Sequence, residues 1–300
     1  MNFPEYIKIV EVGLRDGLQN EPGVISTENK LQIVKSLIES GITNIEVTSF
    51  SHPKLIPQLA DAELLLDTIP WNGGISYSAL VPNLKGFERA QQTKLKEITV
   101  VVSASESHNR ANVNCTIAES LDRINEIFIL ARTKGIRVMG EISVSFGCPF
   151  EGDVSFEHLM YIVGNLYEMG IGEITLADTI GVASPKQVYE TFCLIKKNLP
   201  GIISAAHFHD TNKMALANIL SSMQAGVTVF DSAIGGLGGC PFAPGATGNI
   251  ATENLVLMLD KMGIDTGIDI KQLVKCVFLL EKLVKKHIDL IPELGKVKQS

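Results

Sequence analysis

The sequence predicts a (β/α)8 barrel with additional helices at its C-terminal end. Three observations predict it: short apolar runs alternate with helical patterns, helices repeatedly end in glycine just before the next run, and the length suits the fold. Of the 300 residues, 45% are hydrophobic and 20% are charged, which is typical of a globular protein with a large core. A barrel needs about 250 residues. We therefore expect a single domain over residues 1–300, with the barrel at about 6–262.

Eight short runs rich in Val and Ile are expected to be the barrel strands. Most are apolar on both faces, as in a buried parallel sheet. They are Ile7–Val12, Ile42–Val47, Gly74–Leu80, Glu97–Ser103, Arg137–Val144, Glu173–Ala177, Ile202–His207 and Val229–Ser232. Eight units favour a closed barrel, and an open doubly wound sheet is the alternative.

Amphipathic stretches of helical period separate these runs. Examples are Thr27–Ser40, Thr116–Lys134, Phe156–Met169, Pro185–Asn198 and Asn212–Ala225. Glycines directly before the next run are expected to end several helices, because glycine accepts the left-handed conformation that closes a helix. They are Gly41, Gly135, Gly170 and Gly226. Their recurrence marks the βα repeat.

The segment Asp269–His287 predicts one further helix, with an apolar stripe on one side and lysines on the other. We expect it to pack across the barrel or in a dimer contact. The alternative is that Lys282, Lys285 and Lys286 approach a ligand that carries phosphate.

Charge and cysteine usage narrow the class of protein. A formal charge of -7 without a strong basic cluster argues against a nucleic-acid or membrane surface. No apolar run reaches the roughly 20 residues of a membrane span, and the first residues lack a leader pattern. The cysteines form no CxxC pair and read as reduced thiols, which predicts a cytoplasmic protein. They are Cys115, Cys148, Cys193, Cys240 and Cys276.

Two histidines near the end of the seventh run suggest a metal site. His207 and His209 are two residues apart, so both imidazoles point to the same side of an extended strand. Barrel enzymes carry their chemistry at the carboxyl ends of the strands, and Asp16 follows the first run. We therefore expect one divalent metal ion bound by Asp16, His207 and His209, with Asn249 as a further oxygen ligand. This donor set suits Mg²⁺ or Mn²⁺ better than structural zinc. The alternative is a buried histidine pair bonded to backbone or carboxylates.

Arg15 stands beside Asp16 and could stabilise a developing oxyanion or enolate with its permanent charge. The alternative is a surface ion pair. Glu46 lies in an otherwise apolar strand end, where an unpaired carboxylate would be costly. We expect Glu46 to pair with Arg15 and to orient it. Ser49, Glu141 and Asp178 are further polar residues in or near strand ends.

The loop GGLGGCPFAPGATGN at 235–249 predicts a mobile, closing flap, because so many glycines exclude a helix. Cys240 in this loop is a candidate general acid or base. The alternative is an unreactive small side chain. The loop lacks the GKS or GKT ending of a Walker phosphate loop.

Five strings resemble the 3-hydroxy-3-methylglutaryl-CoA lyase family: VEVGLRDGLQNEPG, IEVTSF, ADTIGVASP, HFHDTN and GLGGCPFAPGATGN. The resemblance covers residues 6 to about 285, and the cysteine loop is its most specific part. RDG and HxHD are shared with a wider superfamily of metal-dependent aldolases and acyltransferases. The resemblance implies a lyase that cleaves 3-hydroxy-3-methylglutaryl-CoA to acetyl-CoA and acetoacetate by retro-Claisen chemistry.

The resemblance also implies a role for each matching residue. The implied metal ligands are Asp16, His207, His209 and Asn249. Arg15 would stabilise the enolate with support from Glu46, and Cys240 would protonate it. The remaining residues implied to line the site are Gln19, Ser49 and Asp178. The base that takes the hydroxyl proton stays open between His207 and Asp16. The expected partners are an acyl-CoA substrate and, because of the apolar C-terminal helix, a second copy of the chain.

The sequence departs from the family at two positions near the histidines. Phe208 replaces a small or thiol residue of some relatives, which we expect to affect packing only, and Lys213 stands where glycine is common. The rival functions are a Claisen-condensing synthase, a pyruvate-type aldolase and a non-catalytic acyl-CoA-binding barrel. The synthases usually carry a regulatory region and lack the GGCP thiol. The acyl-CoA preference and the pathway, leucine degradation or ketone body metabolism among others, are left open.

Overall fold

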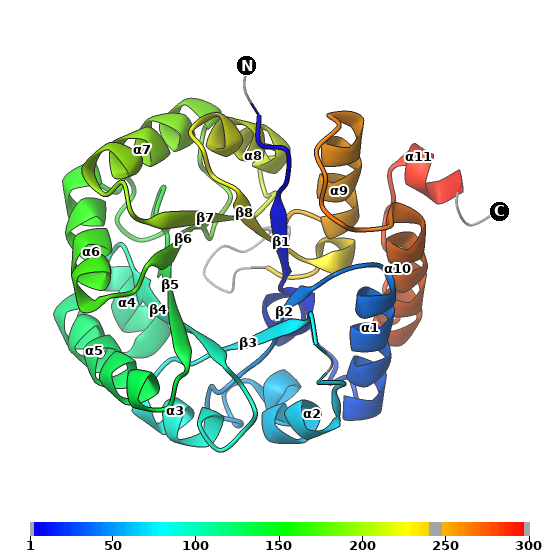
Figure 1. Cartoon of the computed structure of the whole chain (residues 1–300), viewed down its shortest axis with the longest axis horizontal. Helices are drawn as coiled ribbons and strands as arrows, with labels where there is room; N and C mark the ends of the chain where they lie inside the picture. The colour runs from blue at the N-terminus through cyan, green and yellow to red at the C-terminus, as the bar shows by residue number, and fades with distance from the viewer. Residues whose placement is uncertain (1–2, 72, 240–247, 297–300) are drawn as a thin grey trace.

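The computed structural model describes residues 3–71, 73–239 and 248–296. Eight parallel strands follow in chain order around a closed barrel, and β8 pairs with β1 through the register Lys8↔Val229 (Figure 1). The predicted closed barrel is confirmed, and the open sheet is wrong. The strands are β1 (Lys8–Glu11), β2 (Asn44–Ser49), β3 (Ser76–Leu80), β4 (Glu97–Ser103), β5 (Arg137–Ser143), β6 (Glu173–Asp178), β7 (Ile203–Phe208) and β8 (Val229–Ser232).

Helices surround the barrel (Figure 1). They are α1 (Thr27–Glu39), α2 (Ala62–Thr68), α3 (Leu84–Ala90), α4 (Glu106–Val113), α5 (Ile117–Thr133), α6 (Phe156–Met169), α7 (Pro185–Asn198), α8 (Ala215–Gln224), α9 (Thr252–Lys261), α10 (Ile270–Val284) and α11 (Pro292–Gly295). Short turns are η1 (Gly13–Gly17), η2 (Pro57–Leu59) and η3 (Ile234–Gly236). Within the described ranges, no helix is both long and apolar enough to cross a membrane.

Local side chains fix where many helices begin and end. Thr116 and Glu119 form a capping box at the start of α5, which satisfies N–H groups that the first turn leaves unbonded. The glycines predicted to end helices have φ values from +64° to +104°, a region that glycine adopts without strain. These are Gly41, Gly135, Gly170 and Gly226. The predicted helix-to-strand joints are thus confirmed.

Element bounds differ from the predicted ones by a few residues, for local reasons. The last long helix ends at Val284 and not near His287, because Lys285 takes a left-handed φ of +54°. Helix α8 begins at Ala215 and not at Asn212, since Lys213 has a φ of +60°. This conformation favours glycine, so Lys213 adopts a backbone that costs a residue with a side chain more.

The C-terminal helix α10 packs beside α1 on the outside of the barrel (Figure 1). Its apolar stripe is buried, with Leu273, Val277 and Leu280 at most 1% exposed. The predicted packing of this helix against the barrel is confirmed, although it lies beside α1 and not across a barrel end. Lys286 forms an ion pair of 3.1 Å with Glu21. Contact of these lysines with a ligand stays a prediction.

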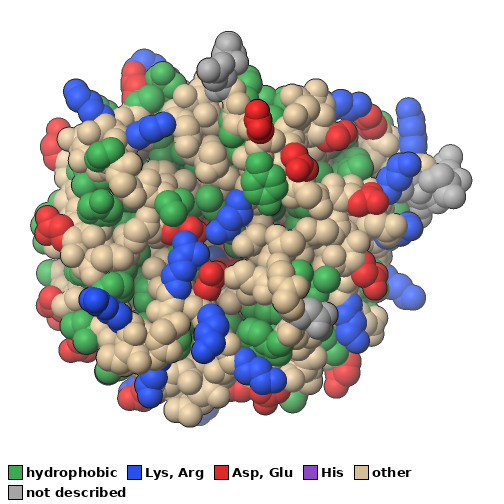
Figure 2. All heavy atoms as spheres, in the orientation of Figure 1, with side chains coloured by type: hydrophobic (Ala, Val, Ile, Leu, Met, Phe, Trp, Pro, Cys, Tyr) green, Lys and Arg blue, Asp and Glu red, His purple; other side chains and the backbone are tan. Residues whose placement is uncertain are grey.

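Charged side chains occupy the amino ends of the strands. Arg137 of β5 lies 2.7 Å from Glu173 of β6 and 3.3 Å from Glu97 of β4, and Lys8 of β1 lies 3.5 Å from Glu173. Figure 2 shows basic and acidic side chains gathered near the centre of the visible face. This network belongs to the amino end of the barrel, so chemistry is expected at the opposite, carboxyl end.

Candidate metal and active site

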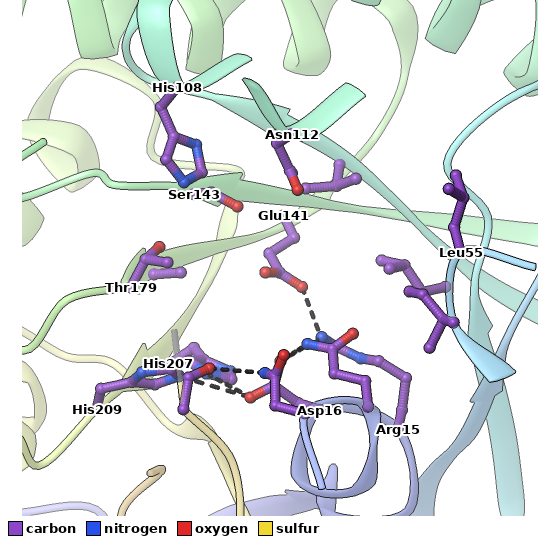
Figure 3. A pocket seen from close by; sticks show the side chains of 17 residues that line it. Arg15, Asp16, Leu55, His108, Asn112, Glu141, Ser143, Thr179, His207 and His209 are labelled. Atoms are coloured by element: carbon purple, nitrogen blue, oxygen red, sulfur yellow. Dashed lines mark hydrogen bonds and ion pairs between the residues drawn. The ribbon is translucent and has the colours of Figure 1, made fainter. Parts of the chain in front are cut away.

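A cavity of about 340 Å³ lies at the carboxyl ends of the strands. Its wall includes Arg15, Asp16, Glu141, His207 and His209, which point toward one another in Figure 3. Barrel strands 1, 5 and 7 or the turns that follow them supply these residues. Residues distant in sequence therefore meet where the fold places its chemistry.

Arg15 is held by three carboxylates. It lies on η1, is 4% exposed, and donates from Nε to Glu46, from Nη1 to Asp16 Oδ1 at 2.8 Å and from Nη2 to Glu141 Oε2 at 3.1 Å. Burial alone would lower the pKa of Arg15, but the three negative charges raise it well above its usual range. The expected pairing of Glu46 with Arg15 is confirmed, and the alternative of a surface ion pair is wrong.

Asp16, His207 and His209 form a cluster that could hold a metal ion. Asp16 Oδ2 lies 3.9 Å from Nε2 of His207 and 3.5 Å from Nε2 of His209, and all three side chains are buried. Ligands about 2.1 Å from a shared ion lie roughly 3–4 Å from one another. The spacing therefore fits one divalent cation.

Asn249 reaches the same cluster from the end of the eighth loop. Its segment returns beside β7, with a bridge between His209 and Asn249 and a 3.0 Å bond from Ile250 N to Phe208 O. Asn249 Nδ2 donates to Asp16 Oδ2 at 2.7 Å. Its buried Oδ1 has no hydrogen-bond partner among the described residues. Because such an atom is costly to bury unpaired, it supports Asn249 as an oxygen donor to a cation.

Gly238 allows the loop to pass close to this cluster. A Cβ atom there would lie 2.5 Å from Asn249 Nδ2 and 3.4 Å from Asp16 Oδ2, and the backbone φ is +123°. Both the contact and the conformation exclude other residues without a shift of the loop. Glycine at this position is thus required by the packing of the site.

Asp231 of β8 lies behind His207. Its Oδ2 atom is 3.2 Å from His207 Nδ1, which turns Nε2 of the same ring toward Asp16. Burial alone would lower the pKa of His207, but the hydrogen bond to Asp231 and the charges of Asp16 and Asp231 raise it to about 9. Sequence reasoning missed Asp231, although an acidic residue within a buried strand was the signal.

The charge of Asp16 follows from its neighbours. Burial alone would raise the pKa of Asp16, but Arg15, the hydrogen bond with His209 and the charge of His207 outweigh burial and hold the pKa well below its usual range. Asp16 is therefore a carboxylate at neutral pH. A cation that binds here competes with the proton that His207 carries.

The other predicted site residues lie at different distances from the cavity. Gln19 lines it and donates to Asp16 Oδ1 at 2.7 Å. Ser49 and Asp178 are buried beside the cavity but are absent from its lining. Asp178 instead accepts hydrogen bonds from Val182 N at 2.9 Å and Ala183 N at 3.0 Å. Cys240, with residues 241–247 of the expected flap, lies outside the described residues.

Five polar residues of the cavity wall did not enter the predicted site. They are Asn20, His108, Asn112, Ser143 and Thr179. Ser143 ends β5 and Thr179 directly follows β6, so their positions at strand ends were a usable signal. His108 and Asn112 belong to α4, and no pattern in the sequence connects that helix with the site.

Comparison with known proteins gives consistent relatives. A model of the HMGL-like family matches residues 6–279. Mitochondrial hydroxymethylglutaryl-CoA lyase from Gallus gallus is 45% identical over 271 residues, 90% of this chain and 91% of the relative. The Arabidopsis thaliana enzyme of the same name is 45% identical over 272 residues, 91% of this chain and 58% of the relative.

Solved structures give the same result. HMG-CoA lyase from Bacillus subtilis superimposes with a TM-score of 0.95 at 42% identity, with 100% of both chains covered. An HMG-CoA lyase from Acinetobacter baumannii in complex with coenzyme A and 3-methylmalate has a TM-score of 0.91 at 39% identity, covering 96% of this chain and 94% of that one.

Proposed function

The chain belongs to the HMGL-like family, and on that premise we propose that it is a lyase that cleaves 3-hydroxy-3-methylglutaryl-CoA to acetyl-CoA and acetoacetate. The observation that carries the proposal is the meeting of two groups in one cavity. Asp16 belongs to a cluster with the spacing of a metal site, and it also binds Arg15, whose Nη1 lies 2.8 Å from Asp16 Oδ1. Retro-Claisen cleavage needs a polarised hydroxyl and a stabilised enolate, and these groups suit the two needs.

We propose Asp16, His207, His209 and Asn249 as the ligands of a divalent cation, Mg²⁺ or Mn²⁺. When bound, such an ion supplies Lewis acidity for the oxygens of the substrate. The unpaired Oδ1 of Asn249 and the 3.5 Å distance from Asp16 to His209 support this ligand set.

Arg15 is the proposed enolate-stabilising group. A guanidinium has five N–H groups, and described carboxylates engage three of them, on Nε, Nη1 and Nη2. As far as the described residues are concerned, one N–H on each Nη nitrogen is left for a ligand. Glu46 fixes the orientation of the plane. Arg15 can therefore meet the thioester oxygen as it gains negative charge, without reorganising first.

Cys240 is the proposed donor of the proton that converts the enolate carbon to a methyl group. The family resemblance supports this role, and so does the position of the cysteine in the sequence between Gly239, which lines the cavity, and Asn249, which contacts Asp16. Gln19 is proposed to contact the substrate directly. Ser49 and Asp178 are proposed to support the site, since neither lines the cavity.

Release of acetoacetate from 3-hydroxy-3-methylglutaryl-CoA tests the function. We expect release in the presence of Mg²⁺ or Mn²⁺ and none after chelation with EDTA. Absence of acetoacetate with either ion would contradict the proposal. The same reaction mixture, analysed for condensation or pyruvate products, separates the lyase from a synthase or an aldolase. Binding without any product would indicate a non-catalytic barrel.

The remaining expectations concern partners and location. We propose one catalytic domain, an acyl-CoA substrate and a cytoplasmic enzyme, although relatives are named as both mitochondrial and cytoplasmic. A homodimer is proposed as well. The apolar stripe of α10 no longer supports it, because that stripe is buried within the same chain. Exposed apolar side chains on α5, α6 and α7 offer another surface, with Ile129 55%, Tyr161 54% and Tyr189 44% exposed. Light scattering tests the dimer.

A further inference from the structure

The proposed cleavage requires a base that the sequence left open. The bond that breaks joins C2, the CH₂ carbon next to the thioester, to C3, the carbon that carries the tertiary hydroxyl. As this bond breaks, the hydroxyl must lose its proton to become the ketone of acetoacetate. Asp16, His207 and His209 turn their lone pairs toward the metal site, so they are poorly placed to accept that proton. Another acceptor on the wall of the cavity is needed.

Glu141 lies on this wall. It comes from β5, is 8% exposed, and its side chain extends from the strand toward Arg15 (Figure 3). One carboxylate oxygen, Oε2, is 3.1 Å from Arg15 Nη2. The other, Oε1, forms no hydrogen bond with any residue that the structure describes. Glu141 thus has an oxygen free to contact a ligand in the cavity.

The other titratable groups nearby fit the task less well. Glu46 and Asp231 are absent from the cavity wall. Glu46 accepts a hydrogen bond from Arg15 Nε, and Asp231 is hydrogen-bonded to His207 Nδ1. His108 lines the cavity, but its Nδ1 lies 2.8 Å from Ser103 Oγ, and burial lowers its pKa to about 4. Among the described lining residues, Glu141 is therefore the carboxylate outside the metal cluster.

We propose that Glu141 is the catalytic base of this reaction, an inference that rests on the proposed function. A Glu141 oxygen takes the hydroxyl proton, the O–H electron pair forms the ketone C=O bond, and the C2–C3 pair moves into the thioester enolate. The enolate carbon then takes a proton from the acid group, and water carries the proton of the Glu141 carboxyl back to that acid group, which restores both. Protons and electron pairs balance over the cycle.

The contact between Glu141 and Arg15 couples the two events. When Glu141 becomes neutral, the negative charge beside Arg15 is lost at the moment that the enolate gains one. The charge next to the guanidinium therefore stays constant during cleavage, and the attraction of Arg15 is redirected to the enolate. Such compensation in a buried site avoids an uncompensated charge.

Substitution Glu141→Gln tests the base, because the amide still accepts a hydrogen bond from Arg15 but cannot take a proton. We expect kcat for cleavage to fall about 10²–10⁴-fold, the usual contribution of general base catalysis. Exchange of the acetyl-CoA methyl protons with deuterated water, followed by NMR, needs Arg15 and the acid group but not this base. The rate of this exchange in Glu141→Gln should stay within about threefold of the wild-type rate. Exposed Glu157→Gln on α6 is the matched control.

Each outcome has a separate meaning. Cleavage by Glu141→Gln at the wild-type rate overturns the inference alone. Parallel loss of cleavage and of exchange also overturns it, since Glu141 would then position Arg15. A wild-type enzyme that fails to cleave the substrate overturns the proposed function itself. If Glu141→Gln folds poorly, Glu141→Ala with added formate replaces it: we expect at least tenfold recovery with formate, and no recovery contradicts a base.

Discussion

Asp231 supports His207 from behind: its Oδ2 atom lies 3.2 Å from Nδ1 of His207, while Nε2 of the same ring faces Asp16 at 3.9 Å. A carboxylate at this position fixes the ring orientation and the tautomer, and it raises the electron density at the opposite nitrogen. The barrel brings the two residues together because β7 and β8 pair with His207 opposite Asp231.

The pair predicts weaker metal binding when its charge is removed. Asp231→Asn should raise the Kd for Mn²⁺ about 10–100-fold, the usual effect of losing such a partner. Isothermal titration calorimetry measures the change. Asp260→Asn, on the exposed side of α9, is the control. A Kd within twofold of wild type for Asp231→Asn would show that His207 is oriented by the strand alone.

Arg15 predicts a loss of rate without loss of metal. Arg15→Gln removes the charge proposed to stabilise the enolate, so kcat should fall by about 10³-fold or more. The Kd for Mn²⁺ should stay within about fivefold, because the metal donors are other side chains. Thermal unfolding must be measured as well, since Arg15 is surrounded by three buried carboxylates. Loss of metal in this variant would make Arg15 a structural residue.

Much of this arrangement could be predicted from the sequence. The strand runs are strongly apolar and the glycine joints recur, so the barrel and its carboxyl end followed from local pattern. The pairing of Glu46 with Arg15 followed from the cost of burying an unpaired carboxylate. These are features whose physical cause lies within a few residues or in one general rule.

Other parts depend on contacts between distant segments. Asp231 meets His207, and Glu141 meets Arg15 of η1, only when β1, β5, β7 and β8 stand at particular places around the barrel. His108 reaches the cavity because α4 folds over the end of β4, and a short polar helix carries no pattern that indicates this. Ser49 and Asp178 stand at strand ends but are absent from the cavity lining, and their contact with a substrate stays a prediction.

We expect replacement of Cys240 to impair turnover without impairing folding. Cys240→Ser replaces the proposed proton donor by a hydroxyl, which is a far weaker acid, so kcat should fall at least 100-fold. The melting temperature and the Kd for Mn²⁺ should match those of wild type. Cys193→Ser, on α7, is the control thiol. Near-normal turnover of Cys240→Ser would dismiss the thiol as the proton donor.

Glu11 predicts a pH dependence of stability. This residue ends β1, and its carboxylate accepts hydrogen bonds from Gly13 N at 2.8 Å, Ile234 N at 2.9 Å and Thr252 Oγ1 at 2.6 Å. It therefore ties the turn that carries Arg15 to the start of the eighth loop. Burial raises its pKa to about 7 from 4.5, although the three hydrogen bonds oppose the rise.

The direction of this pH dependence follows from how many protons Glu11 binds in the folded and unfolded states. Between about pH 4.5 and 7 the folded state holds more protons at Glu11 than the unfolded state, so the stability contributed by Glu11 falls as pH rises, by about 3 kcal/mol in total. Glu11→Gln removes this dependence. The melting temperature of the variant relative to wild type should therefore rise from about pH 5 to about pH 8. A difference that is flat with pH would contradict the raised pKa.

We expect loss of the buried Lys30 ammonium to lower stability and to weaken substrate binding together. This lysine of α1 is 1% exposed, and its Nζ donates to Gln58 O at 2.5 Å and to Asp61. These partners belong to the segment that follows Leu55 and Ile56, which line the cavity. Lys30→Met keeps most of the length of the side chain but removes the hydrogen bond to Gln58 O and the ion pair with Asp61.

The expected cost is about 2–3 kcal/mol of unfolding free energy, at the lower end for a buried ion pair because the Asp61 side chain is 21% exposed. Because the chemical groups stay in place while the cavity wall loosens, KM should rise by more than kcat falls. Urea unfolding and steady-state kinetics measure the two effects, with Lys35→Met on the exposed face of α1 as the control. Equal loss of kcat and kcat/KM would mean that the segment acts on the catalytic groups, and unchanged stability would show that water replaces the ammonium without cost.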